Sequence, residues 1–368
     1  MILQREKERL ATYMPTSYGS TDKLIQSERR FFKESENGVL LQQDESALSF
    51  DAIIRQSDEM DSRWKNYYIE NGSYSVIGDG FVSFKDRDKT VTLDMTSHAF
   101  SQLCQRLGIP SQYIYKCFQS GKQSLALQNL QAWIEQDNGD IMFRTSDGIA
   151  RAIVSQNYMP FDNYKILRVL KETMDKNRFV PTQVFLNQDR LHIRFVDFTP
   201  LPINDGTGSN LYSGFVLSSS NVGDGKLKMS FFIFRPACTN GLIFTKFGGT
   251  LFSMNHIGRN AQHDKLRLFS QAFDNIDFLC EQSVELIKQS NAKPLSENEM
   301  NFLLQTIRTD LKLSQEKIDK LGNIISINYM NTRWGFLNGV TELAQSYDNL
   351  DTRMDLESWA GKFLAKSA

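Results

Sequence analysis

The sequence predicts an α+β fold: an antiparallel sheet with helices on one face, a helical insert before it and a helical C-terminal third. Two observations support this class. Hairpin-linked strands fill the middle of the chain, from Asp140 to Phe244, and they do not alternate with helices. From His263 onward, apolar residues recur at spacings of three and four, which is typical of amphipathic helices.

Composition places the chain among ordinary globular proteins. It has 368 residues, 40% hydrophobic and 23% charged, with a net charge of -1. This near neutrality argues against coating of nucleic acid by bulk charge, so such binding needs a local patch. Changes in composition divide the chain into a polar N-terminal arm (1–62), an α+β core domain (63–262) and a helical C-terminal region (263–368).

The N-terminal arm contains eight Lys/Arg and twelve Asp/Glu, with few apolar residues. This composition predicts a loosely packed arm, and an arm that docks on a neighbouring subunit of a homo-oligomer is the alternative. Its charged start lacks the apolar run of a signal peptide, and no window approaches about eighteen consecutive apolar residues. Four cysteines without a C-x-x-C pair indicate reduced thiols. We therefore expect a cytoplasmic protein with no membrane partner.

Local signals place the helical insert and the first hairpin. Thr96 is expected to cap a helix, Gly108 to end it and Pro110 to open the next. Further along, Asp147-Gly148 stands between two β-rich runs, which predicts a hairpin.

A cationic sheet face is predicted where charge alternates with apolar residues. In the strand Arg190–Phe198, Arg190 and Arg194 point away from the apolar face. In the strand Lys226–Phe234, the lysines share a face with Phe232. Two interpretations stay open: a solvated or helix-covered face, or a surface that tracks a phosphate backbone.

Positive charge gathers near these strands. From Ser213 to Leu268 there are seven Lys/Arg and two acidic residues, a net charge of +5. Cations beside exposed aromatic residues suit sequence-tolerant binding of single strands. Pairing with a core carboxylate is the alternative for Arg151 and Arg235. The predicted nucleic-acid contacts are Arg144, Arg151, Arg190, Arg194, Lys226, Lys228, Phe232, Arg235 and Arg259.

Motifs for other chemistry are missing from the sequence. No histidine or cysteine spacing predicts a metal site, and no glycine motif predicts nucleotide binding, so we expect no cofactor. Cys238 near His256 is the one nominal nucleophile, but its apolar neighbours favour a buried cysteine. Asn240-Gly241 suits a tight turn after a strand. An enzyme is therefore the less favoured hypothesis.

Several segments resemble the phage/plasmid-like proteins of domain-of-unknown-function family 932. The run Arg151–Ser155 with Tyr158 resembles one segment of that family, and Ser220–Gly223 is similar to one of its turns. Arg235–Gly241 is similar to its R-x-x-C-T-N-G run, and Thr332–Glu342 resembles its C-terminal helical segment. The family more often has an asparagine before the serine of the turn, which puts a side-chain role there in doubt. The resemblance covers roughly residues 75–350.

The resemblance implies a mobile-element origin, in a phage or plasmid, and no reaction. A looser analogy, at the level of fold, is to phage single-strand annealing proteins. We therefore hypothesise an ATP-independent protein of the host-cell cytoplasm that binds and anneals single-stranded DNA, as in recombination, and that forms homo-oligomers. The alternatives are a counter-defence or regulatory protein that acts on a host protein, a nucleic-acid-processing enzyme, and a structural protein of the element.

Overall fold

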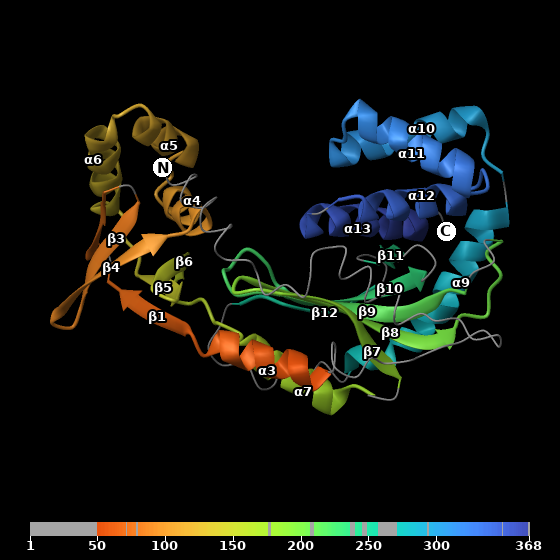
Figure 1. The fold of residues 1–368 in the computed structure, drawn as a ribbon, viewed down its shortest axis with the longest axis horizontal. Helices are drawn as coiled ribbons and strands as arrows, with labels where there is room; N and C mark the ends of the chain where they lie inside the picture. The colour runs from red at the N-terminus through yellow and green to blue at the C-terminus, as the bar shows by residue number, and fades with distance from the viewer. Residues whose placement is uncertain are drawn as a thin grey trace.

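The structure is a computed structural model, and it describes residues 50–70, 72–78, 80–175, 178–206, 210–235, 240–244, 249–256, 271–292, 294–347 and 349–366. These residues form two lobes, each with its own sheet (Figure 1). The first lobe comprises residues 64–155. The second comprises α3 (Phe50–Asp61) and the described residues from α7 (Asn163–Thr173) to the last helix. The first lobe is therefore inserted between two helices of the second.

The first lobe contains a sheet whose described strands run in the order β1-β5-β6-β4-β3-β2. Neighbouring strands are antiparallel, except that β4 and β6 are parallel. Three helices pack on one face, as predicted for the helical insert (Figure 1). The strands are β1 (Trp64–Ile69), β2 (Tyr74–Ile77), β3 (Phe81–Asp86), β4 (Lys89–Met95), β5 (Ile141–Ser146) and β6 (Ile149–Ser155). The helices are α4 (Ser97–Arg106), α5 (Ser111–Gln119) and α6 (Gln123–Ile134).

Local sequence signals explain where these elements begin and end. The Thr96 hydroxyl accepts a hydrogen bond from the Ala99 amide at 3.1 Å, which caps α4. Gly108 lies after that helix with a φ of 68°. Asp147 and Gly148 have φ values of 53° and 76°, so they form the tight hairpin turn between β5 and β6 that their sequence predicts.

The second lobe contains an antiparallel sheet in the order β11-β10-β9-β8-β7, and β12 pairs with β10. The β5–β6 hairpin, expected in this sheet, belongs to the first lobe instead. The strands are β7 (Phe179–Leu186), β8 (Arg190–Pro200), β9 (Tyr212–Ser220), β10 (Leu227–Arg235), β11 (Asn240–Ile243) and β12 (Thr250–Met254). The α+β class and its antiparallel pairing are confirmed.

The helical C-terminal third is also confirmed. The Ser296 hydroxyl and the Glu299 carboxylate form the capping box that the sequence indicates before α10. The predicted start of the first of these helices, at His263, lies outside the described residues. The helices are α9 (Ile276–Ala292), α10 (Glu297–Leu311), α11 (Gln315–Asn328), α12 (Arg333–Gln345) and α13 (Leu350–Lys366).

Helices cover both faces of the second sheet. Leu191, Ile193 and Phe195 of β8 face the main core. On that side the ring of Phe50, in α3, lies 5.3 Å from the ring of Phe195. Helices α12 and α13 lie over the opposite face (Figure 1). The apolar residues of this sheet are therefore shielded on both sides, which suits their near-continuous burial.

Three further expectations need correction. Helices cover both faces of the second sheet, where the sequence predicted helices on one face only (Figure 1). Phe50–Asp61, near the end of the predicted arm, form α3, in which Ile53 and Ile54 are buried. Residues 1–49 of the arm lie outside the described residues. Asn240 and Gly241 belong to β11, where they pair with Arg235 and Phe234, so they do not form the predicted turn. Within the described ranges, no helix is long and apolar enough to cross a membrane.

Candidate nucleic-acid interface

The strand register places the predicted cations of the second sheet on one face. His192 of β8 lies opposite Ser218 of β9, which in turn lies opposite Lys228 of β10. Residues two positions away share this face, so Arg190 and Arg194 also lie on it. The alignment that the sequence suggested is therefore present. Whether this face can contact a ligand depends on which elements of the fold cover it.

Helix α13 covers most of this polar face. A Cβ at Gly361 would lie 2.1 Å from the Ile243 carbonyl oxygen, so the missing side chain lets the helix rest on the backbone of β11. Glu357 points from α13 into the sheet and accepts a hydrogen bond from the Arg194 guanidinium. Both side chains are 0% exposed.

Burial contradicts the predicted nucleic-acid contacts of Arg194 and Phe232. The Arg194 guanidinium lies 5.8 Å from the centre of the Phe232 ring, and both side chains are enclosed between the sheet and the helix. A buried cation needs a carboxylate to offset its desolvation, and Glu357 provides one. The helix-covered interpretation, which the sequence left open, is therefore the right one for Phe232.

Arg235 and Arg190 are also engaged by helices of the second lobe. Arg235 is buried, and it donates to the Asn338 amide oxygen of α12 at 3.3 Å. Its guanidinium lies 5.3 Å from the centre of the Tyr329 ring. Arg190 is partly exposed, but it pairs with Asp224 and with Asp351 of α13. Arg235 is therefore excluded from a phosphate by its burial, and Arg190 is already ion-paired.

Arg144 lies at the contact between the two lobes, which we call the seam. Burial lowers the pKa of this guanidinium, which is 1% exposed. It lies 4.4 Å from the centre of the Trp64 ring and donates to the Asn66 amide oxygen at 3.3 Å. Its Nε donates to the Asn221 carbonyl oxygen at 2.7 Å, so it bonds across the seam and does not reach solvent.

The β9–β10 turn provides the other half of the seam. Three successive carbonyl oxygens accept hydrogen bonds there: Tyr158 donates to Ser220 at 3.3 Å, Arg144 to Asn221, and Gln102 to Val222 at 2.8 Å. These bonds satisfy backbone acceptors that the turn leaves without strand partners.

Arg151 of the first lobe contributes an ion pair to the seam. Its guanidinium pairs with Asp189, in the β7–β8 turn, at 2.9 Å. Pairing with a carboxylate was the alternative that the sequence left open for this residue. Segments 151–158 and 220–223, two of the four on which the family resemblance rests, therefore meet at the seam and hold the two lobes together.

Three lysines remain close to the surface where the polar face leaves the cover of α13. Lys226 is exposed, Lys228 is half-buried, and Lys362 of α13 is half-buried beside them. Burial lowers the pKa of Lys228, and the positive charges of Lys362 and Lys226 lower it further. We call this group the lysine cluster. The sequence predicted Lys226 and Lys228 but missed Lys362, because no local pattern shows which helix covers a strand.

Other predicted chemistry falls outside this surface. Arg259 and Cys238 lie outside the described residues. Among the described side chains, no group of three His, Cys, Asp or Glu is placed to hold a metal ion.

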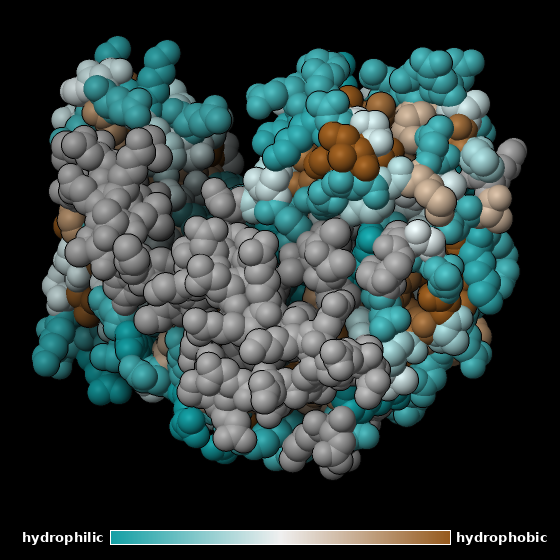
Figure 2. Space-filling view, turned by 45° about the vertical axis from the view of Figure 1, so that its right-hand side comes forward, coloured by the Kyte–Doolittle hydropathy of each residue, from teal (hydrophilic) through white to brown (hydrophobic). Residues whose placement is uncertain are grey.

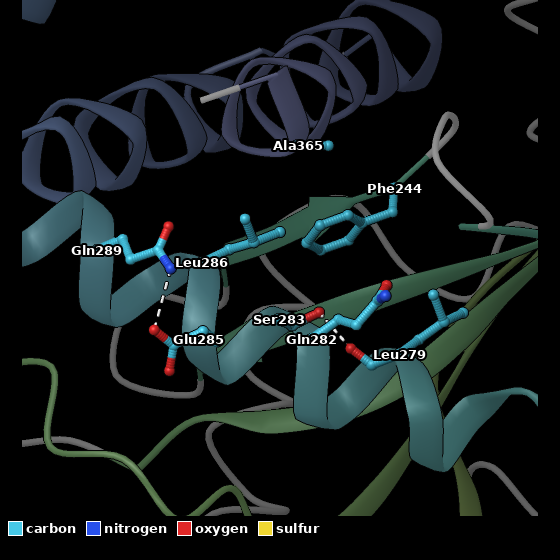
Figure 3. A pocket seen from close by; sticks show the side chains of 8 residues that line it. All are labelled: Phe244, Leu279, Gln282, Ser283, Glu285, Leu286, Gln289 and Ala365. Atoms are coloured by element: carbon cyan, nitrogen blue, oxygen red, sulfur yellow. Dashed lines mark hydrogen bonds between the residues drawn. The ribbon is translucent and has the colours of Figure 1, made fainter. Parts of the chain in front are cut away.

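A pocket of about 370 Å³ opens between α9, β11 and α13 (Figure 3). Three of its polar side chains bond within α9: the Ser283 hydroxyl donates to the Leu279 carbonyl, and Gln289 donates to Glu285. We therefore assign no catalytic role to this pocket. The pocket is lined by Phe244, Leu279, Gln282, Ser283, Glu285, Leu286, Gln289 and Ala365.

Comparisons of the chain with protein-family models, curated proteins and solved structures found no match. The resemblance to phage/plasmid-like proteins therefore stays a prediction.

Proposed function

We propose that this protein binds single-stranded nucleic acid without ATP, as a mobile-element protein of the host-cell cytoplasm, and that the lysine cluster is its phosphate-contacting surface. The observation that supports the proposal is the grouping of Lys226, Lys228 and Lys362. Burial is the main cause that lowers the pKa of Lys228, and the positive charges of Lys362 and Lys226 lower it further, so the three lysines repel one another in the free protein. A bound polyanion would relieve that repulsion.

The size of the cluster limits the affinity of one chain. Each phosphate contact on a single strand adds about 0.7 to the slope of log affinity against log salt, so three lysines give a slope of about 2. A protein that anneals strands needs more contacts than this. Self-association would provide them, because linked copies bind one strand with higher avidity. We therefore propose that the functional form is a homo-oligomer.

The test compares a cluster variant with a matched control. In Lys226→Ala/Lys228→Ala, the salt slope for a labelled single strand should fall by roughly one to one and a half units, with weaker binding at about 50 mM salt. The control, Lys85→Ala/Lys89→Ala, removes two exposed lysines from the β3–β4 hairpin of the first lobe and should leave the slope unchanged. Fluorescence anisotropy at two salt concentrations measures both.

A variant that removes a negative charge near the lysine cluster provides a second test. Asp355 is an acidic neighbour of Lys362 on α13, and its carboxylate opposes a phosphate there. Asp355→Asn should therefore strengthen binding at low salt. An unchanged slope in the double-lysine variant would remove the cluster from consideration. A wild-type protein that binds neither DNA nor RNA at low salt would refute the proposal and leave the alternative of a host-protein target.

A further inference from the structure

The α5–α6 hairpin of the first lobe presents apolar side chains to solvent. Tyr113 of α5 is 43% exposed, and Leu125 and Trp133 of α6 are 45% and 51% exposed. Single exposed apolar residues are common on protein surfaces. A group of them on one surface indicates a contact site.

These side chains form one patch. The spacing of four places Leu125, Asn129 and Trp133 in a row along α6. The Asn129 amide donates to the Tyr113 hydroxyl at 3.1 Å, which sets the tyrosine beside the middle of that row. We call these four residues the tip patch. In Figure 1 it belongs to the two helices at the end of the first lobe that is farthest from α3.

The two helices of the tip patch carry positive charge. Between Ile109 and Ile134, a stretch that contains both helices, the sequence has two lysines and no Asp or Glu. Lys116 follows Tyr113 by one helical turn, and Lys122 precedes Leu125 by three residues. Both lysines are exposed. Glu135, the exposed C-cap residue of α6, follows Trp133 by two residues, and the Gln131 amide donates to it. The cations therefore lie beside Tyr113 and Leu125, and the carboxylate lies at the Trp133 end of the row.

The combination of exposed aromatic rings and lysines indicates which kind of partner the tip patch binds. Cations draw an anionic partner, and exposed indole and phenol rings stack on nucleobases. A single strand offers both unpaired bases and phosphates, whereas a duplex hides its bases. We infer that the tip patch is a base-stacking surface for single-stranded nucleic acid, with Trp133 and Tyr113 on the bases and Lys116 and Lys122 on the phosphates.

The inference rests on the proposed function and adds a preference for single strands to it. The lysine cluster contacts phosphates, which duplex and single strand share. The tip patch contacts bases, which only the single strand exposes. The two surfaces therefore make separable contributions: one sets the dependence on salt, and the other sets the dependence on bases.

Tryptophan fluorescence reads out the tip patch directly. Trp334 and Trp359 are buried, and Trp64 is half-buried beside the Arg144 guanidinium. Trp133 is therefore the tryptophan most accessible to a ligand. The full chain is titrated with oligothymidine and with an abasic strand of the same length and charge. Oligothymidine should quench the fluorescence and bind more tightly, whereas the abasic strand should bind through its phosphates without quenching.

Substitutions at the patch complete the experiment. Trp133→Ala and Tyr113→Ala should each weaken oligothymidine binding by roughly 5- to 150-fold and leave the abasic strand unaffected. Trp133→Phe retains a stacking ring and should restore most of the affinity. Phe302→Ala removes an even more exposed aromatic ring, 70% exposed on α10, and is the matched control that should change nothing.

Three outcomes would overturn the inference. If both alanine variants bind oligothymidine as the wild type does, the patch is not a nucleic-acid contact, although the proposed function stands. If they lower the mass of the protein in solution at unchanged affinity, the patch contacts a second copy of the chain. If the wild type binds neither strand, the inference and the proposed function fail together.

Discussion

Replacing Glu357 with glutamine should destabilise the second lobe more than any surface substitution. The Glu357 and Arg194 side chains are both 0% exposed, and within the described part of the chain the Arg194 Nε and Nη1 atoms have no hydrogen-bond partner. Glu357 is therefore the carboxylate that offsets the buried charge of Arg194. Its second oxygen accepts a hydrogen bond from the Gln345 amide at 3.1 Å, which holds it in place.

The magnitude follows from the burial of the pair. Removing one partner of a fully buried ion pair typically costs about 3–5 kcal/mol, because the remaining charge keeps its desolvation penalty. Glutamine preserves the size of the side chain, so this loss reports charge and not a cavity. Because domains are stable by only about 5–15 kcal/mol, the effect should be large in urea unfolding followed by circular dichroism.

Two further variants define what would refute this reasoning. Arg194→Met/Glu357→Leu removes both charges and should recover most of the stability, since apolar replacement of a buried pair is often neutral. Glu59→Gln breaks the Arg63–Glu59 pair, which is mostly exposed, and should cost less than about 1 kcal/mol. If Glu357→Gln costs as little as Glu59→Gln, then α13 does not bury this pair in solution.

Two other predictions concern the seam. Burial raises the pKa of Asp61 to about 6 from its ordinary 3.8, so the stability it contributes is present below pH 3.8 and lost as pH rises through 6. Asp61→Asn should remove that loss, so the gap between variant and wild type in urea unfolding should widen by about 2 kcal/mol from pH 4 to pH 7. His256, with a pKa lowered to about 4 mainly by burial, acts in the opposite direction in both proteins, so a constant gap would contradict the prediction. Gly223 has a φ of 78°, and its Cβ would lie 2.9 Å from Val154 Cγ1, so Gly223→Ala should cost more than about 1–2 kcal/mol in thermal unfolding. Gly322, in α11 with open space around it, is the control, and its alanine variant should be as stable as the wild type or more so.

Local structure could be predicted from the sequence because its causes are local. The cap at Thr96, the capping box at Ser296 and the Asp147-Gly148 hairpin each depend on residues within four positions of one another. The alternation in β8 likewise separated the two faces correctly, because side chains alternate along any strand.

The sequence could not predict whether the cationic face of the second sheet is exposed or buried, because the carboxylate that pairs with it is far away in the chain. Arg194 and Glu357 are 163 positions apart. The alternation of arginine with apolar residues is the same whether the charged face meets water or a carboxylate from a helix. A search for acidic residues at buried positions of α13 could have suggested the pairing, but only once the helix was known to lie on that face. Lys362 was missed for the same reason.

The contacts at the seam could not be predicted from the sequence for a second reason, which is that their acceptors are backbone carbonyl oxygens. Tyr158, Arg144 and Gln102 bond to the carbonyl oxygens of Ser220, Asn221 and Val222, and every residue has such an oxygen. The residue types in the turn therefore do not indicate which side chains bond to its carbonyl oxygens. The donors, in contrast, are specific side chains. Loss of the Tyr158 or Arg144 donor leaves a carbonyl unsatisfied, at a cost of about 1–3 kcal/mol, whereas the Val222 oxygen also lies 3.3 Å from His98 Nε2. Because the three acceptors are consecutive, a shift of the turn by one residue would break all three bonds together. The relative position of the lobes therefore depends on bonds to the backbone of this turn. The turn places its own requirements on sequence through Gly223, with its φ of 78°, and through the Asn221 amide, which donates to the Gln188 carbonyl at 3.2 Å.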